Sequence, residues 1–136
     1  MEPNKKHFRK RDAILTCLRE TNVHPSAEWV FNRLKPEIPD LSLGTVYRNL
    51  SLFKEQGLIL SLGTVNGVER FDGDTHFHVH FVCNHCDTVQ DLEETPNVPA
   101  LRAAAEQKLG SQIDGCQITF TGTCRQCIDH QKEETA

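Results

Sequence analysis

The sequence predicts an α+β protein in which an N-terminal winged helix-turn-helix is followed by a small α/β unit. Three helical patterns and a hairpin signal follow one another in the first half of the chain, and short strand-like segments surround one helical segment in the second. The polar stretch Asp72-Gly73-Asp74 separates the two halves. We therefore expect a DNA-binding domain over residues 1–72, a hinge at 73–75 and a second domain over residues 76–136.

Composition narrows the class of protein. The 136 residues include 38% hydrophobic and 25% charged residues, which is typical of a globular chain and excludes a disordered one. No apolar run is long enough for a membrane helix and no apolar leader follows Met1, so we expect a cytoplasmic protein without a membrane partner. Residues 1–70 carry a net charge of +3 and residues 71–136 one of −7. The basic half weakly indicates nucleic-acid binding, and the acidic half suits cations.

The first half contains three predicted helices. Residues 8–20 place apolar side chains at helical spacing, and His24-Pro25 interrupts the pattern. Ser26 is a good N-cap for a helix over 27–34, and Ser42 for a helix that ends at Gly57.

A hairpin should follow the third helix, with strands over 58–62 and 68–71 and Asn66-Gly67 in the turn, because these two residues accept positive φ. This hairpin would be the wing, and the third helix would enter the major groove.

The second half should contain strands over 75–82, 88–92 and 117–121 and a helix over 99–109 that ends at Gly110. A unit of only about 60 residues buries little surface, so we expect it to need a structural metal, a partner subunit or both.

Two Cys-x-x-Cys pairs are the strongest chemical motif. Cys83 with Cys86 and Cys124 with Cys127 supply four thiolates, which suffice for a tetrahedral structural zinc site with no open position. A redox pair or two unrelated turns are the alternatives. Two cysteines stand outside these pairs. Cys17 is predicted to pack in the core, and Cys116 is predicted to be an ordinary thiol.

The strand predicted over 75–82 carries three histidines on one face. His78 and His80 can reach a single ion, and Asp72 and Asp91 lie just before this strand and just after it. Imidazoles combined with carboxylates suit manganese, iron or zinc, and the carboxylates favour iron or manganese. A polar face on an exposed strand is the alternative, and we expect His76 to be a neighbour of the site.

The third helix is also the candidate DNA-contacting element. Its polar side and a basic cluster near the N-terminus supply the contacts, since phosphate neutralisation provides much of the affinity for DNA. The predicted DNA-binding residues are Thr45, Tyr47, Arg48, Asn49, Lys10 and Arg11. A purely structural helix–hairpin unit and a solvated basic tail are the alternatives.

Taken in order, these stretches resemble the ferric uptake regulator (Fur) family of metal-sensing bacterial repressors. The matching segments are His24-Pro25-Ser26-Ala27-Glu28, Gly44-Thr45-Val46-Tyr47-Arg48-Asn49-Leu50, Glu69-Arg70-Phe71-Asp72, His78-Val79-His80-Phe81-Val82-Cys83-Asn84-His85-Cys86 and Gly122-Thr123-Cys124-Arg125-Gln126-Cys127. The resemblance covers nearly the whole chain, and Thr-Val-Tyr-Arg and His-x-His-x-x-Cys-x-x-Cys are its specific parts.

The resemblance implies a homodimeric winged-helix repressor, not an enzyme. It would bind palindromic operator DNA when a regulatory metal holds its two DNA-binding domains in a closed arrangement. The ligands that the resemblance implies for structural Zn²⁺ are Cys83, Cys86, Cys124 and Cys127. Those implied for regulatory Fe²⁺ or Mn²⁺ are His24, Asp72, His78, His80 and Asp91. Spacing alone makes His24 a turn residue, and Tyr47 gains the role of a major-groove contact beside Arg48.

The two ligand aspartates point to a branch of the family. Peroxide-responsive members carry aspartates where iron-uptake members usually carry glutamates. Phe77 and Val79 occupy positions of a further metal site in many uptake regulators, and we expect that site to be absent. The resemblance therefore implies that ferrous iron reacts with hydrogen peroxide, that His24 or His78 is oxidised, and that operator DNA is released.

Other functions stay open. The nearest is a metal-dependent uptake repressor for iron, manganese or zinc that ignores peroxide. A metallohydrolase built on the His/Asp site and a zinc-ribbon interaction module are more distant, and no small organic substrate is expected.

One departure from the family is Asp87, which stands where glycine is usual after the second cysteine.

Overall fold

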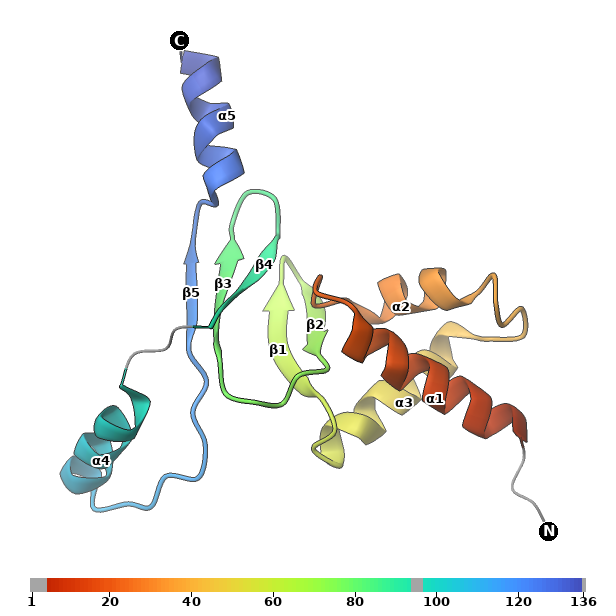
Figure 1. Cartoon of the computed structure of the whole chain (residues 1–136), viewed down its shortest axis with the longest axis horizontal. Helices are drawn as coiled ribbons and strands as arrows, with labels where there is room; N and C mark the ends of the chain where they lie inside the picture. The colour runs from red at the N-terminus through yellow and green to blue at the C-terminus, as the bar shows by residue number, and fades with distance from the viewer. Residues whose placement is uncertain (1–4, 94–96, 136) are drawn as a thin grey trace. The chain divides into compact units, whose positions relative to one another are not determined.

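A computed structural model describes residues 5–93 and 97–135, with the side chains of 9–93 and 97–133, and the chain divides into two compact units between Thr75 and His76 (Figure 1). The N-terminal unit consists of α1 (Lys5–Glu20), α2 (Ala27–Leu34), α3 (Leu43–Glu55), β1 (Leu60–Val65) and β2 (Val68–Asp72). The three helices contact one another, and α1 also contacts β2. Helix α1 begins three residues before the predicted helix over 8–20.

Serine side chains start two of these helices, as predicted. Ser26 Oγ accepts a hydrogen bond from Trp29 N–H and Ser42 Oγ accepts one from Thr45 N–H, each at 3.1 Å. Both serines thereby satisfy a backbone donor that has no partner within the helix. The apolar faces that result form one core, which consists of Ile14, Leu18, Ala27, Val30, Leu34, Ile38, Leu41, Val46, Leu50, Phe53, Ile59 and Phe71.

The hairpin β1–β2 turns at Asn66 and Gly67, which have φ of 53° and 80°. These positive values confirm the predicted turn. Strand β1 lies two to three residues later than the predicted strand over 58–62. The pairing skips between Ser61 and Thr64, where a bulge contains Gly63 at φ 79°, and the bulge lengthens the strand to Val65.

The C-terminal unit contains β3 (Val79–Cys83), β4 (Val89–Leu92), α4 (Val98–Leu109), β5 (Thr119–Gly122) and α5 (Arg125–Thr135). The sheet order is β4-β3-β5, with β4 antiparallel and β5 parallel to β3. Glycine ends α4 as predicted, with Gly110 at φ 64°.

Two predictions for this unit are wrong. The strand predicted over 75–82 begins only at Val79, because pairing with β4 starts at Leu92, directly opposite Val79. Strand β5 starts two residues later than the predicted strand over 117–121, and α5 was not predicted, since its polar sequence has no apolar stripe.

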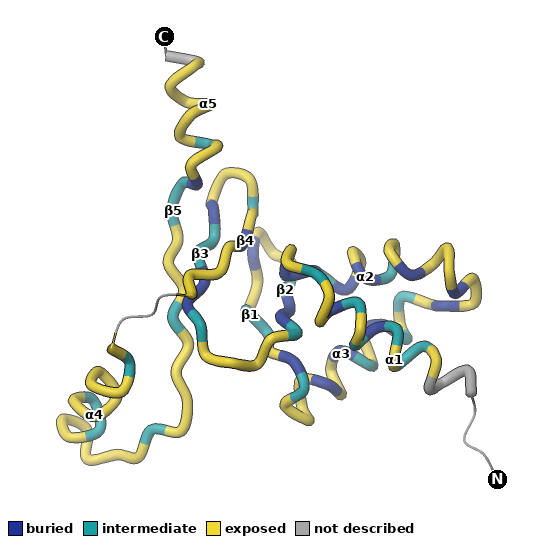
Figure 2. The backbone as a smooth tube through the Cα atoms, viewed as in Figure 1, coloured by how far each residue is buried: buried dark blue, intermediate teal, exposed yellow. Residues whose placement is uncertain are grey.

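Burial differs between the units (Figure 2). In the described part of the C-terminal unit the buried apolar residues are Val79, Cys83, Val89 and Cys124. Helix α4 has no buried residue. No helix in the described ranges combines the length and apolarity that crossing a bilayer requires.

Candidate metal centres

Four cysteine sulfurs lie together in the C-terminal unit. Cys83 ends β3, Cys86 lies in the turn after it, and Cys124 and Cys127 lie at the start of α5. Sγ of Cys83 lies 3.8 Å from Sγ of Cys127, and Sγ of Cys86 lies 3.7 Å from Sγ of Cys124. All four sulfurs lie within 4.8 Å of one another. The two predicted pairs therefore form one cluster.

The dimensions of the cluster fit zinc. Zn–S bonds of about 2.3 Å in a tetrahedron place the sulfurs about 3.8 Å apart, whereas a disulfide would bring two of them to about 2.05 Å. The observed separations match the first geometry, and all six cysteines of the chain are free. Four sulfurs fill a tetrahedron, so such an ion would be structural.

Hydrogen bonds within the cluster favour partial ionisation. The bond donated by Cys124 N–H lowers the pKa of Cys83 to about 6, and the Thr88 hydroxyl, 3.0 Å from the sulfur, lowers the pKa of Cys86. The bond with Cys124 raises the pKa of Cys127 to about 12. Negative charge on adjacent sulfurs is mutually unfavourable, so a divalent cation is the partner that lets all four ionise.

The turn that begins at Cys83 accommodates Asp87, which stands where the family resemblance predicts glycine. Asp87 has φ of 61°, in the left-handed region, and its N–H donates to the carbonyl of Cys83 at 3.1 Å. Aspartate is among the few residues that adopt this conformation at modest cost. The substitution therefore leaves the turn intact.

A first pair of nitrogen and oxygen donors lies in the N-terminal unit. Nε2 of His24, in the α1–α2 connection, lies 3.4 Å from Oδ2 of Asp72, the last residue of β2, and both side chains are buried. The other carboxylate oxygen, Oδ1, accepts a hydrogen bond from Asp74 N–H at 2.9 Å. Gly73 passes so close to α1 that a Cβ there would lie 2.8 Å from the backbone of Leu18. The segment predicted as a hinge is thus closely packed at its start.

A second group of donors lies in the C-terminal unit. Oδ1 of Asp91 lies 3.3 Å from Nε2 of His78 and 3.4 Å from Nε2 of His80. His80 and Asp91 face each other across the β3–β4 pair, as neighbouring strands require. Nδ1 of His78 lies 2.7 Å from the carbonyl oxygen of His76, which assigns the proton to Nδ1 and leaves Nε2 as the ligand nitrogen. This contact gives His76 a supporting role.

Both groups suit a borderline divalent ion. Imidazole nitrogens with carboxylate oxygens, and no sulfur, are donors typical of iron, manganese or zinc. The sequence placed His78, His80, Asp72 and Asp91 near a metal, and each lies within ion-pair distance of another donor of its own unit.

Some of the predicted DNA-binding side chains are exposed, and others contact residues of the N-terminal unit. Tyr47 is 47% exposed, and Arg48 is exposed on the same helix, where its Nη2 donates to Thr45 Oγ1 at 3.1 Å. Asn49 donates to the Thr45 carbonyl at 2.8 Å. Two basic residues of α1 have partners within the unit: Lys10 lies 3.2 Å from Asp40 Oδ2, and Arg11 lies over the Phe53 ring. Tyr47 and Arg48 are therefore the accessible candidates.

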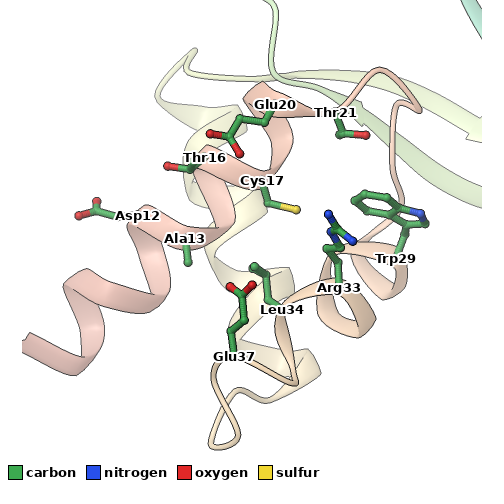
Figure 3. Close-up of a pocket in the computed structure, with 10 residues that line it drawn as sticks. All are labelled: Asp12, Ala13, Thr16, Cys17, Glu20, Thr21, Trp29, Arg33, Leu34 and Glu37. Atoms are coloured by element: carbon green, nitrogen blue, oxygen red, sulfur yellow. The ribbon is translucent and has the colours of Figure 1, made fainter.

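A hollow of about 590 Å³ lies between α1 and α2 (Figure 3). Asp12, Glu20 and Glu37 share its lining with Arg33, and Cys17 points into it. Burial raises the pKa of Cys17, so the thiol stays protonated, in agreement with its predicted place beside the core. Within the described ranges, the two donor clusters that could hold a metal do not include these residues.

Sequence reasoning missed one residue next to a candidate ligand. The guanidinium of Arg70 donates to the backbone carbonyls of Val23 and His24, which lie more than forty positions earlier in the chain. Arg70 belongs to the motif Glu69-Arg70-Phe71-Asp72, but no local sequence pattern predicts that it contacts the carbonyls of Val23 and His24.

Comparisons with known proteins show which family the chain is similar to. The model of the ferric uptake regulator family matches residues 3–121. The peroxide-responsive repressor PerR of Staphylococcus aureus is 30% identical over 120 residues, which are 88% of this chain and 80% of that protein. The crystal structure of the Campylobacter jejuni peroxide stress regulator superposes with a TM-score of 0.79 at 27% identity, covering 90% of this chain and 92% of the other. The ferric uptake regulator of Vibrio cholerae gives 0.71 at 26% identity, covering 91% and 92%.

Proposed function

The chain belongs to the ferric uptake regulator family of metal-dependent transcriptional regulators, and we propose that it is a homodimeric repressor that senses hydrogen peroxide. The observation that carries this proposal is the chemistry of the donors within each unit: an imidazole beside an aspartate in the N-terminal unit, and two imidazoles beside an aspartate in the C-terminal unit, with no sulfur in either group. The 30% identity to a peroxide-responsive repressor supports the same branch.

In this proposal the regulatory ion joins the two units. His24 and Asp72 bind it from the N-terminal unit, and His78, His80 and Asp91 bind it from the C-terminal unit. With five protein ligands, a bound iron ion would still be able to accept peroxide as a further ligand. Because the ion holds both units at once, its binding selects the closed arrangement that fits DNA.

Bound ferrous iron would promote cleavage of the O–O bond of hydrogen peroxide, with one oxygen leaving as water and the other entering a C–H bond of an imidazole, which would be the net two-electron reductant. His24 and His78 are the rings we expect to receive it, and an oxidised ring binds the metal less well. An ion that favours the closed arrangement 100-fold contributes about 2.7 kcal/mol to it. Losing one ligand removes much of this contribution, and the operator is released.

The DNA-binding domain over residues 1–72 is a winged helix, joined through 73–75 to the second domain. Helix α3 enters the major groove with Tyr47 and Arg48, and the β1–β2 hairpin is the wing. The accessibility of Tyr47, 47% exposed on a helix whose other face is buried, supports this assignment.

The domain over residues 76–136 binds structural zinc and a second copy of the chain. It has few buried residues of its own, yet it exposes large apolar side chains, which a homodimer interface would cover. The exposed apolar residues are Phe77, Leu92, Leu101, Leu109, Phe120 and Ile128.

A peroxide challenge tests the proposal. The protein is loaded with Fe²⁺ or with Mn²⁺, exposed to hydrogen peroxide, and assayed for operator binding and for oxygen addition by mass spectrometry of peptides. We expect one added oxygen on the peptide of His24 or His78, and loss of DNA binding, in the iron form only. An iron form without added oxygen that keeps its DNA contradicts peroxide sensing.

The same experiment separates the second candidate, a repressor that responds to metal supply alone. The 26% identity to the Vibrio cholerae ferric uptake regulator over 91% of this chain favours it. Such a repressor would bind DNA with either metal, with or without peroxide.

The DNA-binding half has its own test. Tyr47→Ala should lower affinity for an operator selected from a random-sequence library about tenfold, because a base contact contributes about 1–3 kcal/mol. Zinc content should stay at one ion per chain. Unchanged affinity would show that Tyr47 does not contact the groove.

A further inference from the structure

His24 adopts a backbone conformation that few side chains tolerate. Its φ is 54°, and Asn66 and Asp87 are the other residues of this kind within the described ranges, apart from glycines. Unlike those two, His24 is a proposed metal ligand: its Nε2 lies 3.4 Å from Oδ2 of Asp72. A strained residue at a functional site persists only when its surroundings enforce the conformation.

The surroundings here are the second half of β2. Arg70 donates from Nε to the carbonyl of His24 and from Nη2 to the carbonyl of Val23, the latter at 2.6 Å. Phe71 N–H donates to the carbonyl of Pro25 at 2.9 Å. Three consecutive carbonyls therefore accept hydrogen bonds from two adjacent residues, and the next residue of the strand is Asp72.

We propose that Arg70 is a positioning residue of the regulatory metal site: its guanidinium holds the turn at residues 23–25 so that the imidazole of His24 faces the carboxylate of Asp72. This inference rests on the proposed function, since it concerns the same ion. Arg70 does not bind the ion in this proposal, and it acts through the backbone of Val23 and His24. The planar fork of two N–H donors suits two neighbouring carbonyls, which a lysine ammonium cannot reproduce.

The positive charge of Arg70 predicts the opposite effect on metal affinity from the positioning role. A guanidinium repels a nearby divalent cation, so its removal would strengthen metal binding if electrostatics dominated. Positioning predicts weaker binding. The sign of the change therefore separates the two roles.

The test measures Mn²⁺ affinity of the zinc-loaded full-length protein, from the electron paramagnetic resonance signal of free Mn²⁺. Arg70→Lys and Arg70→Gln should each weaken binding about tenfold or more, the range found when a residue that orients a metal ligand is replaced. Zinc content should not change. In the metal-free protein, the amide NMR signals of Val23 and His24 and the imidazole signals of His24 should shift in Arg70→Lys, while the amide signals of α3 stay in place.

Glu69→Gln is the matched control. Glu69 precedes Arg70 on β2 and bonds to Ser61 at 2.6 Å and Lys54 at 3.2 Å, so its loss disturbs the same strand without touching the turn at residues 23–25. It should keep the wild-type Mn²⁺ affinity. A drop equal to that of the Arg70 variants would assign the effect to the strand as a whole and overturn the inference.

His24→Ala distinguishes failure of this inference from failure of the proposed function. If His24→Ala binds Mn²⁺ as tightly as wild type, the regulatory site itself is misassigned. If His24→Ala weakens binding but both Arg70 variants bind like wild type or more tightly, only the positioning role is wrong. Loss of the folded N-terminal unit in both Arg70 variants would also overturn it, because Arg70 would then serve the fold and not the site.

Discussion

The two units of the chain obtain stability in different ways. Twelve buried apolar side chains, from three helices, two connecting segments and strand β2, form the centre of the N-terminal unit. The described C-terminal unit buries only Val79, Val89, Cys83 and Cys124 among apolar residues, and two of these belong to the thiol cluster. A core of the first kind forms from the chain alone, whereas a unit of the second kind depends on what it binds.

This difference suits a regulator. The N-terminal unit has a core of its own, so we expect the surface with Tyr47 and Arg48, which is proposed to contact DNA, to keep its shape whatever the metal supply. The unit that carries the thiols and His80 has few buried side chains, so we expect it to gain much of its stability from the ligands proposed for it. In the proposed function, metal binding could therefore act as a switch without unfolding the N-terminal unit.

Removing the zinc ligands gives the largest effect. Cys124→Ser should abolish zinc binding and dimer formation, because structural zinc contributes about 10–16 kcal/mol to folding in small domains. The N-terminal unit should unfold as in wild type, followed by fluorescence of Trp29, the single tryptophan, which lies in α2. Cys116→Ser, which removes an exposed thiol outside the cluster, is the control. A dimeric Cys124→Ser protein with one zinc per chain would contradict the four-sulfur site.

A mutation in the core of the N-terminal unit should lower the stability of that unit and leave zinc binding unchanged. Phe53 is fully buried, so Phe53→Ala should lower the free energy of unfolding of the N-terminal unit by about 3–5 kcal/mol. Urea denaturation followed by Trp29 fluorescence measures it, and zinc content should not change. Leu52→Ala, at a neighbouring position that is 39% exposed, should cost less than about 1 kcal/mol. Zinc loss in Phe53→Ala would show that the units do not fold independently.

A substitution in the proposed dimer interface should have the next largest effect. Leu101 on α4 is 57% exposed, so Leu101→Glu should leave the monomer intact but weaken the dimer by about 2 kcal/mol, roughly 30-fold in dissociation constant. Sedimentation equilibrium measures the change. Leu60→Glu, at an exposed leucine of the N-terminal unit, serves as the control, and equal weakening by both would remove α4 from the interface.

The smallest effect concerns pH. The hydrogen bond from Ser61, and then Lys54, lowers the pKa of Glu69 below its usual value of 4.5. A lowered carboxylate pKa stabilises the folded state above the unfolded pKa, and the contribution disappears as the pH falls through the folded pKa. Glu69→Gln should therefore cost less than about 1 kcal/mol at pH 7 and progressively less below pH 4.5. Urea denaturation followed by Trp29 fluorescence, at pH 7 and below pH 4.5, tests this prediction. A stability difference between wild type and Glu69→Gln that grows in acid would contradict the lowered pKa of Glu69.

Local chemistry made most of the fold predictable. Ser26, Ser42 and Asn66-Gly67 start helices or form the turn through interactions with residues at most three positions away, and these are visible in the sequence. The start of β3 was not predictable, because it depends on where Leu92 ends the partner strand. Alternation of side chains continues into residues 75–78 without any pairing to match it.

The candidate sites show the same limit. The two cysteine pairs, and His80 with Asp91, lie on adjacent strands or turns, so spacing was sufficient to group them. His24 gained a role only through family resemblance, and Arg70 gained none. Its bonds to Val23 and His24 join residues 46 and 47 positions apart, and such contacts follow from the fold and not from any local pattern.

Strand β3 links both kinds of ligand within five residues: His80 faces Asp91, and Cys83 ends the same strand about 10 Å away. The thiol cluster fixes that end of the strand and the turn that leads into β4. If both sites hold the proposed ions, we expect zinc to bind first and iron or manganese second. Cells starved of zinc would accumulate chains that ignore iron, manganese and peroxide alike, however abundant these become.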